Sequence, residues 1–390
     1  MRDLATALAR RRQQQLYRQR QTLDSPQGVE IAIDGETYLS FSSNDYLGLA
    51  SHPKLVSALI EGAQRFGVGS GAAHLITGHS YAHQALEEDL AAFTGQPRAL
   101  LFSTGYMANL GVASALIGRG DTMVEDRLNH ASLLDAAQLS GARLLRYQHN
   151  DMESLQRRLS GIEHGDTLVA TDAVFSMDGD CAPLLEMQAL CLRHESWLLI
   201  DDAHGFGVLG DEGCGWYADQ LGKGADNTIL MATLGKALGT FGAFVAGSDE
   251  LVETLIQQAR TYIYTTATPP AIAWATRTAL RLVREGDALR ARLRELIQRF
   301  RSGAVELGLP LMESTTPIQP MLVGDAVTAV QLGKALRSRG ILVGVIRPPT
   351  VPEGASRLRI TLSAQHSPEQ VDRLLDALGN FYREVAHAAS

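Results

Sequence analysis

The stretch Ile229-Leu230-Met231-Ala232-Thr233-Leu234-Gly235-Lys236-Ala237-Leu238-Gly239 places a lysine directly after an apolar run. The run predicts a buried strand, because four to eight apolar residues bounded by glycine are typical of one. Small residues surround Lys236, so its amine has little means of reaching water. Burial disfavours the charged form of an amine, and a neutral lysine amine can attack a carbonyl group. A surface loop lysine is the alternative interpretation of this stretch taken alone.

A second stretch, Leu199-Ile200-Asp201-Asp202-Ala203-His204-Gly205, adds two acids and an imidazole. Asp201 and Asp202 are consecutive on a predicted strand, so their side chains point to opposite faces and only one can reach a given ligand. An acid at the pyridinium nitrogen tunes pyridoxal 5′-phosphate (PLP), and a lysine holds it. The two stretches together therefore predict a PLP site.

Short apolar runs alternate with helical patterns through the middle of the chain. The predicted strands are residues 99–102, 122–124, 143–147, 167–171, 197–201, 228–232 and 243–246. Such alternation predicts an α/β fold with a mostly parallel sheet covered by helices on both faces. Ligands of these sheets bind beyond the carboxyl ends of the strands. The polar or small residues predicted there are Gly105, Tyr106, Ser176, Asp201, His204 and Thr233.

The flanking segments predict three further features. Residues 1 to about 25 have the pattern of a basic helix, and Glu30–Leu39 predicts a hairpin that turns at Asp34-Gly35. Residues 270–308 predict a linking helix pair, and the remainder predicts a smaller α+β domain with apolar runs at 321–323, 341–345 and 358–362. The predicted division is an N-terminal segment 1–45, a PLP-binding domain 46–280 and a linking helix with a small domain 281–390.

Composition excludes several classes of protein. The net charge of −8 over 390 residues argues against general nucleic-acid binding. The three cysteines have neither C-x-x-C nor metal-site spacing, which indicates a reducing compartment. No apolar run is long enough to span a bilayer, and the Arg-rich start lacks the apolar core of a signal peptide. We therefore expect a soluble, cytoplasmic protein without a metal and without membrane partners.

Two shorter motifs are compatible with cofactor binding. Ser103–Asn109 follows a predicted strand and opens a helix, whose free N–H groups suit a phosphate. His130, near another helix start, could stack on a flat aromatic cofactor. A purely structural turn and a capping histidine are the alternatives for these motifs taken singly.

Several motifs together resemble the α-oxoamine synthase family of PLP-dependent enzymes. They are Asn44-Asp45-Tyr46-Leu47-Gly48-Leu49, Asn129-His130-Ala131-Ser132-Leu133-Leu134-Asp135, Phe175-Ser176-Met177-Asp178-Gly179-Asp180, Asp201-Asp202-Ala203-His204-Gly205 and Thr233-Leu234-Gly235-Lys236. The resemblance runs from about residue 5 to 385. It implies PLP-dependent transferase fold type I, with a seven-stranded sheet in the large domain, and a homodimer. One departure is Ala73-His74, where many members of the family carry an arginine.

The resemblance also implies roles for individual residues. Lys236 would form the Schiff base, Asp201 would meet the pyridinium nitrogen, and His130 would stack on the ring. The other implied cofactor contacts are Gly105, Tyr106, Ser176, His204, Thr233 and, from the neighbouring subunit's Thr261–Thr266 stretch, Thr265. The implied substrate contacts are Arg18, Asn44, His130, Arg347 and Thr350.

Arg347–Pro352 and Ser42–Tyr46 most resemble members of the family that condense L-alanine with a pimeloyl thioester. The pimeloyl group would arrive on coenzyme A or on an acyl carrier protein. Sister enzymes that use glycine are the closest alternative. A PLP-fold module of a transcription regulator is another alternative, but no helix-turn-helix segment is evident. A catalytically inactive homologue is disfavoured because Lys236 and Asp201 are both present.

Overall fold

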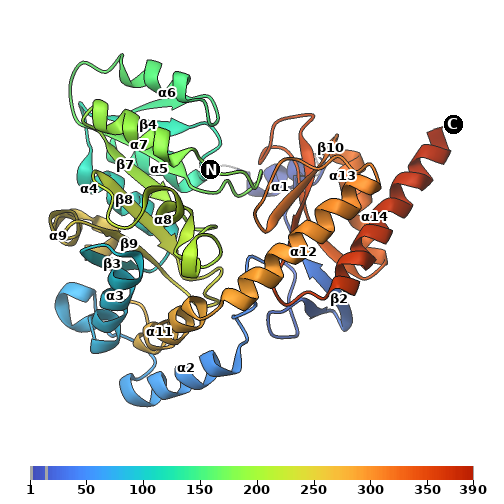
Figure 1. Ribbon diagram of the computed structural model, residues 1–390, viewed down its shortest axis with the longest axis horizontal. Coiled ribbons are helices and arrows are strands. Elements are labelled where there is room, and N and C mark those ends of the chain that lie inside the picture. The colour runs from blue at the N-terminus through green and yellow to red at the C-terminus, as the bar shows by residue number, and fades with distance from the viewer. Residues whose placement is uncertain (1–2, 14–15, 390) are drawn as a thin grey trace.

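The protein consists of a large α/β unit and a smaller α+β unit that lie side by side (Figure 1). The computed structural model describes residues 3–13 and 16–389 of the chain. Helix α11 (Pro270–Arg284) packs on the large unit, and α12 (Asp287–Glu306) runs from there into the small unit. These two helices confirm the predicted linking pair.

The large unit is built on a seven-stranded sheet with the order β3-β9-β8-β7-β6-β4-β5. Only β9 runs antiparallel to its neighbours, which confirms the mostly parallel sheet and all seven predicted strands. The strands are β3 (Arg98–Phe102), β4 (Thr122–Asp126), β5 (Arg143–Tyr147), β6 (Thr167–Asp172), β7 (Trp197–Asp201), β8 (Thr228–Thr233) and β9 (Ala243–Gly247).

Helices cover both faces of this sheet. Successive side chains of each central strand point to opposite faces, and those on both faces are apolar. Along β8, Leu230 and Ala232 enter one core while Ile229 and Met231 enter the other. The first core is covered by α3 (Tyr81–Thr94), α6 (Met152–Leu159), α7 (Leu184–Arg193), α8 (Gly215–Leu221) and α11. The second is covered by α4 (Gly105–Leu116), α5 (Ala131–Ser140), α9 (Asp249–Gln258) and α10 (Arg260–Ile263). Helix α2 (Pro53–Phe66) packs on α11.

The small unit contains a five-stranded sheet with the order β1-β2-β11-β12-β10. The predicted hairpin forms β1 (Glu30–Ile33) and β2 (Glu36–Phe41), and both turn residues have positive φ. The C-terminal elements are β10 (Ile318–Gly324), α13 (Ala326–Ser338), β11 (Ile341–Ile346), β12 (Ser356–Thr361) and α14 (Pro368–Ala389). Strand β2 pairs in parallel with β11, with Leu39 opposite Ile341, so the two ends of the chain share one sheet.

The N-terminal helix is shorter than predicted. Helix α1 spans Leu4–Gln13, whereas the basic pattern predicts a helix to about residue 25. None of its side chains is buried, so no core contact extends it. Residues 16–22 lack regular structure, and Leu23 forms an isolated bridge with Ile33. The predicted helix also covers residues 1, 2, 14 and 15, which lie outside the described residues.

No helix in residues 3–13 and 16–389 has the length and apolar character needed to cross a bilayer.

Candidate active site

A cavity of about 180 Å³ lies where parallel strands of the large sheet end. Eight residues that the sequence singles out line this cavity. They are Gly105, Tyr106, His130, Ser176, Asp201, His204, Thr233 and Lys236. Ser132, Asp172, Val174, Ala203 and Met231 complete the lining. The carboxyl ends of β6, β7 and β8 converge at this edge, as expected for an open α/β sheet.

Lys236 begins a chain of hydrogen bonds that leads from the cavity into the small unit. Its Nζ lies 2.7 Å from Nε2 of His204, and Nδ1 of His204 lies 2.6 Å from Oη of Tyr46. Tyr46 donates to Oδ1 of Asn44 at 3.2 Å, and Nη2 of Arg359 donates to the same oxygen at 3.1 Å. Since the last two groups donate, the consistent direction is that Lys236 donates to His204 and His204 donates to Tyr46.

The surroundings of Lys236 favour its neutral form. Burial lowers the pKa of its amine to about 8, although the charges of Asp201 and Asp172 oppose this shift. Burial, followed by the charge of Lys236, lowers the pKa of His204 well below its usual value. A lysine with a pKa near neutrality can act as a nucleophile or a base under ordinary conditions.

The two consecutive aspartates face different surroundings, as predicted for neighbours on a strand. Asp201 lines the cavity, where its Oδ2 accepts from Nδ2 of Asn109 at 2.8 Å. Asp202 is fully buried on the other side and accepts from the backbone N–H of Tyr217 at 3.0 Å. Burial raises the pKa of Asp202 to about 8, which favours the protonated form of this side chain. Only Asp201 is therefore placed to meet a ligand in the cavity.

Asp172 is a cavity residue that the sequence reasoning missed. It ends β6 directly opposite Asp201 on β7, and its Oδ1 accepts from the backbone N–H of His130 at 3.3 Å. Burial, followed by the charge of Asp201, raises the pKa of Asp172 well above its usual value. Its position after the apolar run 167–171 was the available signal, the same one that identified the other strand-end residues.

Two helix N-termini form the lip of the cavity. Thr104 caps α4 by accepting from the N–H of Met107 at 3.2 Å, which leaves the first N–H groups at Gly105 and Tyr106 available for an anion. His130 is exposed at the start of α5, with Nδ1 2.8 Å from Oγ of Ser132. Tyr106, also exposed, hydrogen-bonds to Asp135 of the same helix as Ser132.

Arg359 is the second residue that the sequence reasoning missed. It is buried on β12 of the small unit, and its Nε donates to the carbonyl of Ser176 at 2.5 Å. Its charge lies close enough to Lys236 and His204 to lower the pKa of both. The alternation Ser356-Arg357-Leu358-Arg359-Ile360 was the available signal, because it places two arginines on one face of a buried strand.

The remaining predicted site residues do not line the cavity. Arg18 is exposed in the irregular segment 16–22, and Thr350 is exposed beyond β11. Arg347 is half-buried at the end of β11, and Thr265 is half-buried after α10. Asn44 reaches the site indirectly, through Tyr46 and Arg359. The roles of all these residues stay predictions.

The residues of the cavity fit PLP. Asp201 offers an acid for the ring nitrogen, Lys236 an amine for the carbonyl carbon, and the start of α4 offers N–H groups for the phosphate. His204 and Ser176 add polar atoms between these points, and His130 places an imidazole at the lip.

Comparisons with known proteins agree with this geometry. The family model of class I and II aminotransferases matches residues 36–378. The chain is 60% identical to the 8-amino-7-oxononanoate synthase of Stutzerimonas stutzeri, over 96% of each chain, and 58% identical to that of Thioalkalivibrio sulfidiphilus, over 98% of each.

Solved structures show the same fold. A solved structure of serine palmitoyltransferase (SPT) with PLP has a TM-score of 0.93 to this structure at 30% sequence identity. The match covers 99% of this chain and 100% of the SPT chain. The 8-amino-7-oxononanoate synthase of Francisella tularensis has a TM-score of 0.79 at 32% identity, over 90% of this chain and 99% of its own. The chain therefore belongs to the class I and II aminotransferase family and, within it, to the PLP-dependent α-oxoamine synthases that include the 8-amino-7-oxononanoate synthases.

Proposed function

We propose that the protein is an 8-amino-7-oxononanoate synthase of biotin biosynthesis. It condenses L-alanine with a pimeloyl thioester and releases CO₂ and the free thiol carrier. The observation that carries this proposal is the near-full-length identity of 60% to a synthase of that name, joined to the placement of Lys236 and Asp201 in one cavity.

When bound, PLP supplies an electron sink for the negative charge left when the α-proton of the amino acid is removed. Lys236 is the group that moves this proton, because its amine titrates near pH 8 and its Nζ faces the cavity. Asp201 holds a proton at the ring nitrogen, and Asn109 fixes the orientation of the Asp201 carboxyl group. His204 holds the Lys236 amine in place before the cofactor arrives.

Arg359 is our candidate for binding the carboxylate of L-alanine. It is the arginine that contacts Asn44 and the backbone of Ser176 beside the cavity. A planar guanidinium suits a carboxylate because it can donate two parallel hydrogen bonds. Arg347, the arginine that the family resemblance implies, remains the alternative anchor.

The acyl donor is proposed to bind with the help of Arg18, His130 and Thr350, on coenzyme A or on an acyl carrier protein. Arg10, Arg11 and Arg12 concentrate positive charge at the end of α1 and would attract either carrier. This contribution acts on the association rate and weakens with salt.

A homodimer is also proposed, with Thr265 of each chain reaching the partner's cofactor phosphate. Apolar side chains near Thr265 support a covered surface, since Tyr264 is 70% and Ile76 is 75% exposed in the single chain. We infer the cytoplasm as the compartment, because Cys181, Cys191 and Cys214 are all free thiols.

A product assay tests the proposed function. Purified protein with PLP is given L-alanine or glycine, each with pimeloyl-coenzyme A or pimeloyl-acyl carrier protein, and products are identified by mass spectrometry. We expect 8-amino-7-oxononanoate from L-alanine, and no product from the Lys236→Ala variant. Preferred turnover of glycine would instead assign a sister activity such as that of 2-amino-3-ketobutyrate CoA ligase.

A further inference from the structure

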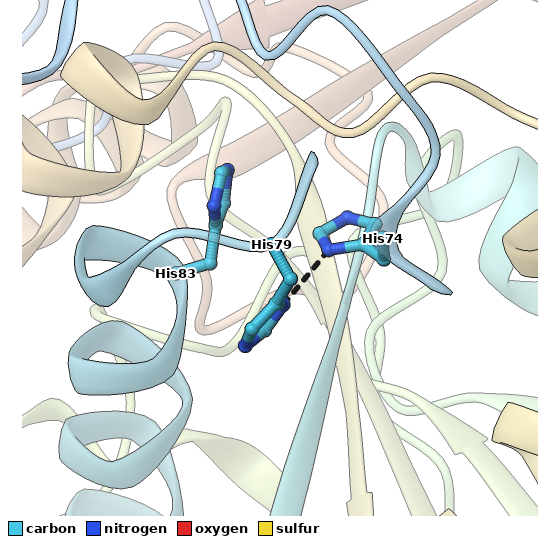
Figure 2. A group of neighbouring side chains, drawn as sticks. All are labelled: His74, His79 and His83. Carbon is cyan, nitrogen blue, oxygen red and sulfur yellow. Dashed lines mark hydrogen bonds between the residues drawn. The ribbon is translucent and has the colours of Figure 1, made fainter. Parts of the chain in front are cut away.

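Three histidines form a cluster (Figure 2), and none of them lines the active-site cavity. His74 begins a short π-helix (His74–Gly78), His79 follows it, and His83 lies in the first turn of α3. One ring nitrogen from each lies within 4.8 Å of the others. His74 and His83 are buried and His79 is half-buried. None of the three has a role in the proposed reaction.

The hydrogen bonds of His83 and His79 indicate which ring nitrogen carries the proton and which carries the lone pair. Nε2 of His83 donates to the carbonyl of Thr268 at 2.7 Å, because a carbonyl oxygen can only accept. Nε2 of His79 faces Oε1 of Gln84 at 3.3 Å. Nδ1 of both rings therefore carries a lone pair, which is the form of imidazole that binds a metal ion.

His74 completes the inward set. Its Nδ1 lies 2.9 Å from Nδ1 of His79, the hydrogen bond that is drawn as a dashed line in Figure 2. Because Nδ1 of His79 accepts, Nδ1 of His74 carries the proton of this hydrogen bond. For a divalent ion to bond to both nitrogens, the proton of the neutral His74 ring must move from Nδ1 to Nε2, which leaves a lone pair on Nδ1. Neutral imidazole in this form is the usual histidine ligand of a metal ion.

The spacing of the nitrogens is close to that of a tetrahedral site. Zinc binds histidine nitrogen at about 2.0–2.1 Å, which separates two ligands by about 3.3 Å at the tetrahedral angle. The pair of His74 and His79 must open slightly from 2.9 Å, and the widest pair must close from at most 4.8 Å. His79 is the half-buried member of the cluster, so its ring has more room to rotate than the two buried rings.

His83 must exchange two contacts to take part. Its Nδ1 lies 3.0 Å from both the backbone nitrogen and Oγ of Ser80, and a metal ion would compete for that lone pair. The other half of the capping box, in which the Ser80 side chain accepts from the N–H of His83, is unaffected. Helix α3 therefore keeps one of its two capping hydrogen bonds when a metal binds.

Groups around the cluster match those that usually support metal-binding histidines. Such a histidine typically donates its outer N–H to a carbonyl or a carboxylate, which orients the ring. Thr268 provides the carbonyl for His83. Gln84 and the buried Glu87, whose Oε2 lies 3.9 Å from Nε2 of His79, provide oxygens for His79.

We propose that His74, His79 and His83 bind one Zn²⁺ per chain, or a similar divalent ion such as Co²⁺ or Ni²⁺. Three neutral nitrogen ligands favour these ions over Mg²⁺ and Ca²⁺, which prefer oxygen. Water fills the fourth position. None of the three histidines lines the active-site cavity, so metal binding can be measured separately from turnover.

The bound ion would stabilise residues 262–268, which form the end of α10 and the segment after it. The His74 ring stacks on Tyr262 with centroids 4.9 Å apart, Ala73 bridges Thr266, and His83 holds the carbonyl of Thr268. All three contacts join the histidine cluster to residues 262–268. An ion shared by the three rings would link these contacts and limit the motion of the segment.

Metal titration of the full-length protein, without a histidine tag and with PLP bound, tests the proposal. The protein is first treated with a chelator, and then dialysed against Zn²⁺ or Co²⁺ at rising concentration. Metal analysis gives the stoichiometry, and the visible spectrum of Co²⁺ reports tetrahedral coordination. We expect about one ion per chain, and binding at least about 100-fold weaker in His74→Gln and His79→Gln, since loss of outer-shell groups alone costs 10–100-fold.

The exposed His164 provides the matched control, and His164→Gln should bind metal like the unchanged protein. Circular dichroism and the absorbance of bound PLP establish that each variant is folded. If a ligand variant does not fold, Gln84→Leu decides the matter, because it removes only an outer-shell acceptor and should weaken binding about tenfold. Metal binding that is absent, or equal in the unchanged protein and the folded variants, overturns the proposal.

Discussion

The amine of Lys236 lies 2.7 Å from Nε2 of His204, so the nitrogen proposed to react is held by a neutral acceptor. The pKa of His204 is lowered by burial and by the charge of Lys236, which keeps its ring from competing for a proton. Tyr46 fixes the other ring nitrogen at 2.6 Å. The cavity therefore presents an oriented lysine before any ligand binds.

This arrangement predicts how fast the cofactor-free protein captures PLP at different pH values. Only the neutral amine reacts, and burial lowers the pKa of Lys236 to about 8. The capture rate should rise about tenfold per pH unit below pH 8 and level off above it. The rate at which PLP reacts with free N-acetyl-lysine should instead keep rising until about pH 10.4, the ordinary pKa of a lysine amine. Stopped-flow absorbance measures both rates.

Borohydride reduction of the same samples provides a check on the residue. The cofactor should be fixed to the peptide that contains Lys236, and Lys236→Ala should bind PLP without being labelled. Label on any other lysine, or a capture rate that still rises beyond pH 9, would remove Lys236 from this role.

The surroundings of the two aspartates predict opposite results for two matched substitutions. Asp201→Asn should keep PLP bound but lose about 10²–10³-fold in kcat, the usual cost of removing one preorganised electrostatic group. Asp202→Asn should retain most activity, because burial already favours the protonated form of Asp202 and its side chain contacts the backbone of Tyr217 away from the cavity. Steady-state kinetics at saturating PLP compares them, and the reverse order of losses would assign the ring nitrogen to Asp202.

The large sheet could be predicted from the sequence because its strands are continuous apolar runs. The cavity could be predicted because polar residues follow those runs. Lys236, Asp201 and His204 were found in this way. Asp172 was missed although it follows the same pattern. The extent of α1 was overestimated, because helical propensity alone does not replace the core contacts that this helix lacks.

Contacts between distant segments could not be predicted from local patterns. The pairing of β2 with β11 joins residues about 300 apart in sequence, and Arg359 reaches Asn44 and Ser176 across the same boundary. The alternation along β12 places Arg359 on a face of a buried strand, but no local pattern indicates which distant residues it contacts. Motif resemblance implies Arg347, while the structure places Arg359 beside the cavity.

The two arginines can be separated by kinetics. Arg359→Lys should raise KM for L-alanine about 10–100-fold, because a lysine cannot make the paired hydrogen bonds of a guanidinium and a charged hydrogen bond contributes about 1.5–3 kcal/mol. PLP binding should be nearly unchanged. Arg347→Lys, measured in parallel, should leave KM for L-alanine within about twofold. A larger effect at Arg347 would restore it as the carboxylate anchor.

His149 predicts a pH dependence of stability that is separate from catalysis. Its two ring nitrogens lie 3.0 Å from Asp126 and 2.7 Å from Asp180. Burial opposes protonation, but hydrogen bonds to both acids and their charges outweigh it and raise the pKa of His149 to about 10. The histidine ordinarily titrates at about pH 6.5 when unfolded. Its contribution is therefore complete below about pH 6.5 and is lost as the pH rises towards 10.

We expect His149→Gln to lower the free energy of unfolding by about 1–3 kcal/mol at pH 6, the cost of leaving a buried polar partner unsatisfied. The difference from the unchanged protein should shrink by pH 10. Urea unfolding at both values measures it, with His164→Gln as the exposed control. A difference that stays constant between pH 6 and pH 10 would mean that the charge of His149 does not contribute.

The last prediction concerns the subunit interface. Ile76 is 75% exposed beside the bridge between Ala73 and Thr266, and that bridge adjoins Thr265. A charge at Ile76 would be buried without a partner if a second chain covers this surface, which costs several kcal/mol. Ile76→Asp should therefore shift the protein towards the monomer at micromolar concentration, as measured by analytical ultracentrifugation. Val305, which is 70% exposed on α12, provides the control, and Val305→Asp should remain dimeric.

Activity of Ile76→Asp should fall on dilution and recover on concentration, because each site is proposed to need Thr265 of the partner. A fully active Ile76→Asp monomer would show instead that one chain forms a complete site.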